Sequence, residues 1–182
     1  MIPADAGAVL VPLARFAIED RLGLTRGRAA PTASWLGEPG ATFVTLTKHG
    51  ELRGCIGSLE AWRGVGEDVA SNARAAAFRD PRFPPVRADE VADLRVEVSL
   101  LSPATPLTFV DEADAVAQLR PGVDGVILSA AGRRGTFLPQ VWEQLPEPGL
   151  FLAHLKRKAG LPASYWGPDV RLERYTVTKW TE

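Results

Sequence analysis

The feature that constrains the fold most is a short turn between two segments with the pattern of β-strands. The turn is Lys48-His49-Gly50-Glu51, and the segments on its two sides are Ala41–Lys48 and Leu52–Leu59. Strands joined by so short a turn pair as an antiparallel hairpin. A further strand is expected at Leu94–Leu101, where apolar and polar residues alternate. The sequence therefore predicts an antiparallel sheet.

The remaining elements mix helices with strands. Apolar spacing and capping residues predict four helices, at Ala8–Leu22, Val65–Phe78, Asp111–Leu119 and Leu150–Ala159. A second hairpin and a last strand are expected at Val123–Ser129, Gly135–Leu138 and Val170–Trp180. Strand and helix do not alternate regularly, as they would around a parallel sheet. We therefore expect the α+β class, with a mainly antiparallel sheet packed against helices.

Composition narrows the function classes without selecting one. With 21 Lys and Arg against 22 Asp and Glu in 182 residues, the net charge is −1, which disfavours nucleic-acid binding. The single cysteine, Cys55, cannot form an intramolecular disulfide and fits a reducing compartment. The longest uncharged stretch, Val98–Val110, is shorter than the roughly 18 apolar residues of a membrane span. We therefore expect a cytoplasmic protein that does not enter the membrane.

Few residues could hold a metal ion or a cofactor. Cys55, His49 and His154 are far apart in sequence, and neither CxxC nor HExxH occurs, so no metal site is expected from these types. Carboxylates that bind magnesium remain an open alternative. The segment Gly64-Val65-Gly66 lacks the third glycine of a dinucleotide fingerprint, and there is no P-loop. The cofactor is thus left unknown.

An unusual segment lies in the second strand of the first hairpin. In Leu52–Ser58, which has the sequence LRGCIGS, Gly54 and Gly57 bracket Cys55. Strand interiors normally avoid glycine, so the pair indicates that a ligand or another chain segment approaches the backbone closely. Strict alternation places Arg53 and Cys55 on one face, about 7 Å apart. A guanidinium there would favour the thiolate, the nucleophilic form of cysteine.

Structural explanations stand beside these functional ones. A lone cysteine in a strand is more often a small buried apolar residue, and paired glycines can mark a β-bulge. The loop Asp80-Pro81-Arg82-Phe83 is stiffened by proline and could hold its two charged side chains at a site. It could equally be a structural turn with a salt bridge. Both interpretations remain open for each segment.

Several motifs resemble one family. Leu52–Ser58 is similar to the characteristic segment of the AMMECR domain family, whose bacterial and archaeal members are known as AmmeMemoRadiSam system protein A. Further similar motifs follow the family order and are Phe43–Leu46, Asn72–Ala73, Asp80–Phe83, Glu97–Ser99, Gly122–Val126, Phe137–Val141 and Lys158–Pro162. The resemblance extends from about Leu10 to Tyr175. We therefore expect residues 1–182 to form a single AMMECR-type domain.

The resemblance implies a fold and a site. It implies an α+β fold with a larger and a smaller lobe, and a pocket lined by Arg53–Gly57. Asp80, Arg82, Glu97 and Ser99 match family positions and are expected around the same place. The expected catalytic residues are Cys55, Arg53 and Glu97, and the expected ligand-binding residues are Gly54, Ile56, Gly57, Asp80, Arg82 and Ser99.

The resemblance also implies partners. Prokaryotic members of the family are associated with a radical S-adenosylmethionine enzyme and a Memo-like protein related to extradiol dioxygenases. This chain has neither the three-cysteine cluster of the first nor the histidines of the second. Two functions follow as alternatives. One is a pocket-bearing component, either a Cys55-dependent enzyme or a ligand-binding subunit, and the other is a non-catalytic protein-interaction scaffold.

Overall fold

The computed structural model describes residues 1–182, which form two compact units. Unit 1 comprises Met1–Leu101 and Thr178–Glu182, and unit 2 comprises Ser102–Val177. Each unit contains a four-stranded sheet whose strands pair antiparallel, together with its own helices and hydrophobic core. The predicted α+β class with a mainly antiparallel sheet and a larger and a smaller lobe is confirmed.

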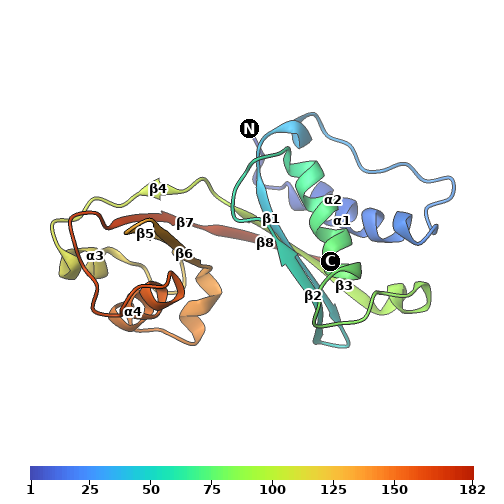
Figure 1. The fold of residues 1–182 in the computed structure, drawn as a ribbon. Coiled ribbons are helices and arrows are strands. Elements are labelled where there is room, and N and C mark those ends of the chain that lie inside the picture. Colours follow the sequence, from blue (N-terminus) through green and yellow to red (C-terminus); the bar gives the residue numbers. More distant parts are fainter. The chain divides into compact units, whose positions relative to one another are not determined.

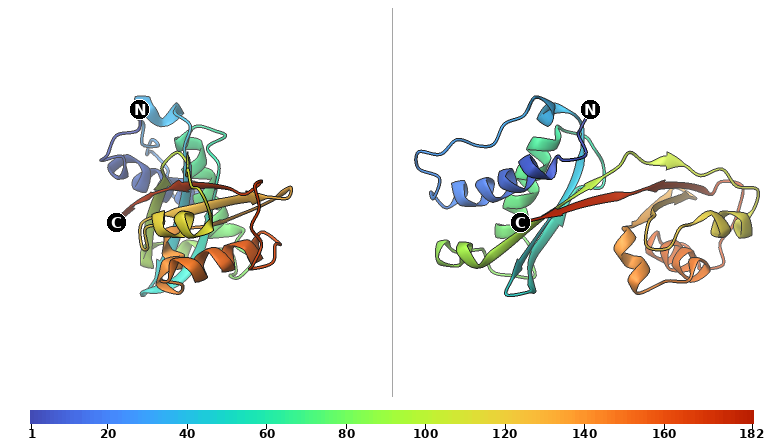
Figure 2. Two further views of the ribbon diagram at one scale, coloured as in Figure 1. Left: turned by 90° about the vertical axis from the view of Figure 1, so that its left-hand side faces the viewer. Right: turned by 180° about the vertical axis from the view of Figure 1, so that it is seen from behind.

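Unit 1 is a sheet with helices on one face. The strands lie in the order β2-β1-β3-β8, with bounds β1 Ala41–Lys48, β2 Glu51–Gly57, β3 Leu94–Leu101 and β8 Val177–Thr181. Helices α1 (Gly7–Arg21) and α2 (Val65–Phe78) pack side by side on one face of this sheet (Figures 1 and 2). Short 3-10 helices occur at η1 (Ser34–Gly37) and η2 (Ala88–Asp93).

Alternation along the strands decides which side chains meet the helices. Val44 and Leu46 of β1 and Val96 and Val98 of β3 are buried in the core that α1 and α2 cover. Residues at the intervening positions, including Thr45 of β1, lie on the opposite face because successive strand residues point to opposite sides. That face is free of helices from this unit and is the one on which Cys55 lies.

Unit 2 has the strand order β4-β7-β5-β6. Its elements are β4 Thr105–Pro106, α3 Glu112–Gln118, β5 Gly125–Ala130, β6 Arg133–Phe137, η3 Pro139–Glu143, α4 Pro148–Lys158 and β7 Arg171–Tyr175. The core is built around Phe151 of α4, whose ring stacks on Trp142 with centroids 3.7 Å apart. Trp142 Nε1 also donates a hydrogen bond to the carbonyl of Asp124 at 2.7 Å.

The last predicted strand is in fact two strands. The alternating pattern of Val170–Trp180 predicts one continuous strand, but the chain divides it at Thr176 into β7 and β8, which belong to different sheets. Two hydrogen bonds join Thr176 to Ser102: the Thr176 N–H donates to the side-chain Oγ of Ser102 at 2.9 Å, and the Thr176 carbonyl accepts from the Ser102 N–H at 2.8 Å. No glycine or proline marks this division.

No helix of the chain has the length and apolar character that crossing a membrane requires.

Candidate functional site

Cys55 lies in a row of side chains that crosses three strands of unit 1. Cys55 of β2 is paired with Thr45 of β1, and Thr45 is paired with Glu97 of β3. Directly paired residues point to the same face, so the three side chains lie on the face away from the helices. Cys55 is half-buried, and its Sγ lies 3.2 Å from Thr45 Oγ1. Two strand spacings separate Cys55 from Glu97 by about 10 Å.

The loop after α2 holds both backbone polar groups of Cys55. Asp80 Oδ2 accepts a hydrogen bond from the Cys55 N–H at 3.0 Å, and Arg82 Nη2 donates to the Cys55 carbonyl at 3.4 Å. Arg82 Nη2 and Nε also donate to the carboxylate of Asp80, at 2.7 and 3.0 Å. The predicted loop Asp80–Phe83 therefore contacts the predicted cysteine, and its salt bridge is part of that contact.

The charges of this loop are fixed by their surroundings. The hydrogen bond from Arg82 holds the pKa of Asp80 well below its usual range, and the backbone N–H of Cys55 acts in the same direction against the opposing effect of burial. Asp80, which is 4% exposed, is thus an anion at neutral pH. The hydrogen bond with Asp80 raises the pKa of Arg82, and the nearby Cys55 sulfur adds to that shift.

Arg53 is engaged elsewhere. Leu46 pairs with Gly54 and Thr47 pairs with Leu52, so Arg53 is the extra residue of a β-bulge. Its Nε donates a hydrogen bond at 2.7 Å to Oε1 of Glu90, a residue of η2. Burial has the largest single effect on the pKa of Glu90 and raises it, but the hydrogen bond and charge of Arg53, the N–H of Arg87 and the charge of Lys48 together outweigh burial, so the net shift is downward. Strict alternation, on which the pairing of Arg53 with Cys55 depends, therefore fails at the bulge, and the arginine at Cys55 is Arg82.

Packing within the chain accounts for both glycines. A Cβ on Gly54 would lie 2.1 Å from the carbonyl oxygen of Ala76 in α2, and one on Gly57 would lie 2.2 Å from Cγ of Phe43. A close approach to the backbone, by a ligand or by another chain segment, was one explanation for the glycine pair. At both positions the close neighbour is a part of the chain itself.

Two further predicted site residues lie around this segment. Ile56 packs against the core between the sheet and the helices. Ser99 is buried on the same face as Cys55 and is paired with Phe43. The structure therefore does not bring all the predicted site residues together. Cys55, Asp80 and Arg82 are in contact, and Glu97 lies on the same face of the sheet as Cys55. Ile56 lies on the opposite face.

A buried polar network stands behind the end of β2. Asp68 of α2, fully buried, accepts hydrogen bonds from the N–H and Oγ1 of Thr42 and from Asn72 Nδ2 at one oxygen, at 2.8, 2.7 and 3.0 Å. Its other oxygen accepts from Ser58 Oγ at 2.7 Å and from Arg63 Nε at 2.8 Å. Neither Asp68 nor Thr45 stands out in the sequence. Each is recognised only through a partner that lies far along the chain.

Side chains of metal-binding type do not cluster. No group of three or more His, Cys, Asp or Glu side chains is placed so that it could hold a metal ion. The Cys55 cluster, which we define as Thr45, Cys55, Asp80 and Arg82, thus offers a thiol, a hydroxyl and an arginine as its chemical groups.

Comparison with known proteins gives a consistent relationship. The profile of the family described as AMMECR1 matches residues 11–180. A protein of Methanothermobacter thermautotrophicus is 40% identical over 177 residues, covering 94% of this chain and 91% of the relative, and protein MK0488 of Methanopyrus kandleri is 36% identical over 178 residues, covering 92% and 84%. The crystal structure of PH0010 from Pyrococcus horikoshii superposes with a TM-score of 0.80 at 34% identity, covering 100% of this chain and 93% of that one.

Proposed function

Because the chain belongs to the AMMECR1 family, we propose that it is a ligand-binding component whose site is the Cys55 cluster, with the Cys55 thiol as its reactive group. The observation that carries this proposal is the hold of one loop on both backbone groups of Cys55. A thiol whose main chain is fixed on both sides has a defined position, which nucleophilic attack requires.

Arg82 supplies the charge at this site. Its side chain is 54% exposed, whereas Asp80 beneath it is buried, so the guanidinium presents its free side to a ligand. An arginine there favours the thiolate and can hold an anionic group of the ligand. We propose that Glu97, about 10 Å across the same face and contacted by Lys179 and Thr181, acts on a bound ligand rather than on the thiol. Arg53 has no part in this proposal because Glu90 engages it.

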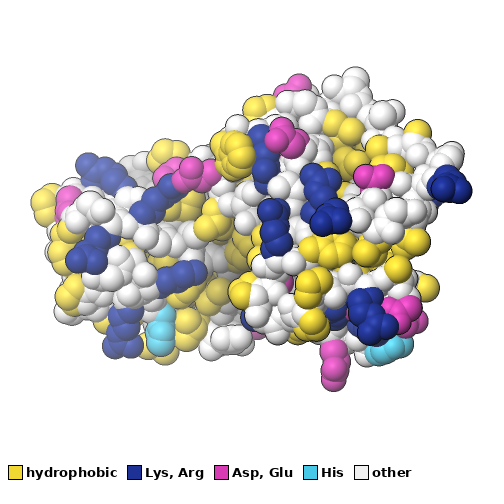
Figure 3. Space-filling view, turned by 45° about the vertical axis from the view of Figure 1, so that its right-hand side comes forward, with side chains coloured by type: hydrophobic (Ala, Val, Ile, Leu, Met, Phe, Trp, Pro, Cys, Tyr) yellow, Lys and Arg dark blue, Asp and Glu magenta, His cyan; other side chains and the backbone are white.

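The wider setting is proposed from the family. We propose that the protein acts with a radical S-adenosylmethionine enzyme and a Memo-like protein in the cytoplasm. A single cysteine leaves the three-cysteine cluster of the radical enzyme to that partner. Nucleic acid is not among the proposed ligands. In support, the net charge of −1 gives no general attraction to a polyanion, and in the view of Figure 3 both acidic and basic side chains are present on the surface.

Alkylation of Cys55 tests the proposal. We expect iodoacetamide to label Cys55 faster than a free cysteine peptide at some pH between about 5 and about 9, and Arg82→Gln to slow that labelling. Arg87→Gln is the matched control, since Arg87 is 74% exposed and has no contact with Cys55. Labelling no faster than the peptide at any pH in this range would overturn the reactive-thiol proposal.

The scaffold alternative has one observation in its favour. Trp62 and Leu59, 69% and 47% exposed, lie on the loop Ser58–Arg63, and both ends of this loop are bonded to Asp68. A fixed loop with an exposed tryptophan is suited to a protein interface. If Trp62→Ala loses partner binding while Cys55→Ser keeps both binding and pathway activity, the scaffold function is the correct one.

A further inference from the structure

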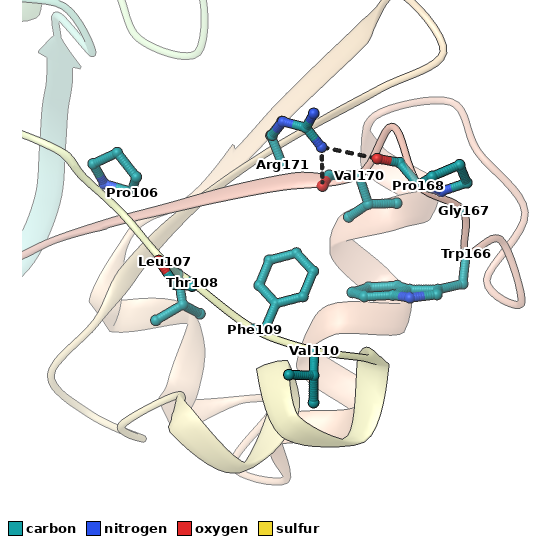
Figure 4. A pocket seen from close by; sticks show the side chains of 10 residues that line it. All are labelled: Pro106, Leu107, Thr108, Phe109, Val110, Trp166, Gly167, Pro168, Val170 and Arg171. Carbon is teal, nitrogen blue, oxygen red and sulfur yellow. Dashed lines mark hydrogen bonds between the residues drawn. The ribbon is translucent and has the colours of Figure 1, made fainter.

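Two neighbouring strands of unit 2 separate at one end of their ladder. β4 (Thr105–Pro106) pairs with β7, and the last hydrogen bond between the two segments joins the Leu107 N–H to the Leu172 carbonyl at 2.8 Å. Beyond this bond, residues 106–110 and residues 166–171 line the two sides of a groove of about 690 Å³ (Figure 4). The groove therefore begins where the ladder ends.

Phe109 lines this groove and has unpaired main-chain groups. On its two sides, the Thr108 carbonyl accepts a hydrogen bond from Gln118 Nε2 at 2.9 Å and the Val110 N–H donates to Asp114 Oδ2 at 3.0 Å, so both groups face α3. In an extended chain the main-chain groups of successive residues point to alternate sides. The N–H and C=O of Phe109 therefore face away from α3, and no group of the chain forms a hydrogen bond with either.

Across the groove the main chain is already bonded. Continuing the register of β4 and β7 by three residues places Phe109 opposite Val170. The Val170 N–H donates to the carbonyl of Gly167 at 3.2 Å, and the Val170 carbonyl accepts from Arg171 Nη1 at 3.1 Å. Val170 thus forms its bonds within its own segment, and Phe109 lacks the partner that a continued ladder would give it. Unpaired main-chain groups of this kind are what an added strand bonds to.

Aromatic and aliphatic side chains form most of the lining. The rings of Phe109 and Trp166 have their centroids 5.4 Å apart and are tilted by 55°. Leu107 and Val170 are buried in the core of unit 2, against which both rings pack, and Val110 is 89% exposed. Aromatic rings prefer apolar groups and other rings in offset or tilted arrangements as neighbours. The lining therefore suits an apolar side chain.

No charge accompanies the two rings. The lining contains no acidic residue, and Arg171 is its single charged residue. Arg171 precedes Leu172 on β7, and Leu172 is buried in the core, so the two side chains point to opposite faces of the sheet. The rings pack against the core, on the side of Leu172. The part of a ligand that meets the rings is therefore uncharged.

We propose that this groove binds an extended, uncharged segment of a partner protein by strand addition. One residue of the segment pairs its N–H and C=O with those of Phe109, and its apolar side chain lies against the rings of Phe109 and Trp166. In strand addition the main-chain hydrogen bonds give affinity and a pocket for a side chain gives specificity. The proposal depends on unit 2 alone and is independent of the reactivity of Cys55, so either can fail without the other.

Capped tripeptides test the proposal on the full chain. The probe is acetyl-Ala-Phe-Ala amide, and the readout is the NMR signal of the Phe109 main-chain amide, assigned with Phe109→Leu. We expect the peptide to shift this signal saturably. Methylation of the central peptide nitrogen removes one donor and should weaken binding by about fivefold. Alanine in place of the central phenylalanine should weaken it by about tenfold or more. Toluene, which supplies the ring without a peptide bond, should bind more weakly than the peptide.

A variant of the protein tests the aromatic side of the groove. Trp166→Leu should weaken binding of acetyl-Ala-Phe-Ala amide and reduce its advantage over the all-alanine peptide. Trp62→Leu is the matched control, since Trp62 is 69% exposed and belongs to unit 1, and it should leave both affinities unchanged. In the unmodified protein, a Phe109 signal that the peptide does not shift would show that the proposal is wrong. Equal affinities for the peptide and its methylated form, or for the peptide and toluene, would show the same.

Discussion

Gly57 lies directly beneath the ring of Phe43, so a Cβ atom on Gly57 would come within 2.2 Å of the ring. Gly54 has an equally close neighbour, the carbonyl oxygen of Ala76 at 2.1 Å. The two neighbours differ in one respect. The ring of Phe43 can turn about its side-chain bonds, whereas the carbonyl belongs to the backbone of α2 and can move only with the helix.

Alanine at the two glycines is therefore expected to have unequal effects. Gly54→Ala should lower the free energy of unfolding by about 3 kcal/mol or more, and Gly57→Ala by about 1–3 kcal/mol. Phe43→Leu combined with Gly57→Ala should recover part of the second loss. Chemical denaturation measures all three. Gly37→Ala is the control, since open space surrounds Gly37 and its effect should be small. Equal effects at positions 37 and 54 would contradict this explanation.

Removing the charge of Asp80 should loosen the loop at Cys55. Asp80→Asn keeps the size of the side chain but weakens its bonds to Arg82 and to the Cys55 N–H, so we expect a loss of about 2–4 kcal/mol of stability. Hydrogen exchange of the Cys55 amide should quicken at the same time. Asp89→Asn, at an exposed carboxylate paired with Arg87, should change neither quantity. If the hydrogen-exchange rate of the Cys55 amide is unchanged in Asp80→Asn, this loop does not fix β2 in place.

Acid should destabilise the protein through Asp80. Because its pKa in the folded protein is lower than in the unfolded chain, Asp80 contributes stability that is complete above the unfolded pKa of about 4 and is lost as the pH falls below it. We expect the unfolding free energy to decrease more steeply below about pH 4 in the unmodified protein than in Asp80→Asn. Urea denaturation at several pH values measures this difference. Parallel curves for the two proteins would show that Asp80 does not carry the dependence.

Asp68 should contribute more to the stability of the protein than exposed acidic residues near it. Asp68→Asn weakens the bonds that join Thr42, Ser58 and Arg63 to α2 while leaving these groups buried or half-buried, so we expect a loss of about 3 kcal/mol. The loop with Trp62 should become easier to cleave by protease. Glu67→Gln, one residue earlier and exposed, is the control. A stability equal to that of the control would mean that the network is dispensable.

Much of the fold is predictable from local pattern. The bounds of β1, α2 and β3 agree with those expected from alternation, helical spacing and proline. The division of the last strand at Thr176 is not, because its sequence continues to alternate and only the sheets on its two sides determine where each half pairs. The two-residue strand β4 is likewise too short to leave a pattern.

The site is predictable only where it depends on neighbours in sequence. Counting pairs outward from the turn at Lys48–Glu51 places Thr45 opposite Gly54, but the bulge at Arg53 shifts the register and places Thr45 opposite Cys55. Because of the same bulge, Arg53 does not lie beside the thiol, and the arginine that contacts Cys55 is Arg82. Register and bulges depend on packing against α2 and η2, which lie far along the chain and leave no local signal.

The loop Asp80–Arg82 also affects how readily the protein can aggregate. β2 is the outermost strand of its sheet, and an outermost strand with free N–H and C=O groups can recruit another copy of the chain and start an aggregate. At Cys55 both groups are already occupied by side chains, so an incoming strand finds no partner there. The residues that position the thiol thus also discourage self-association.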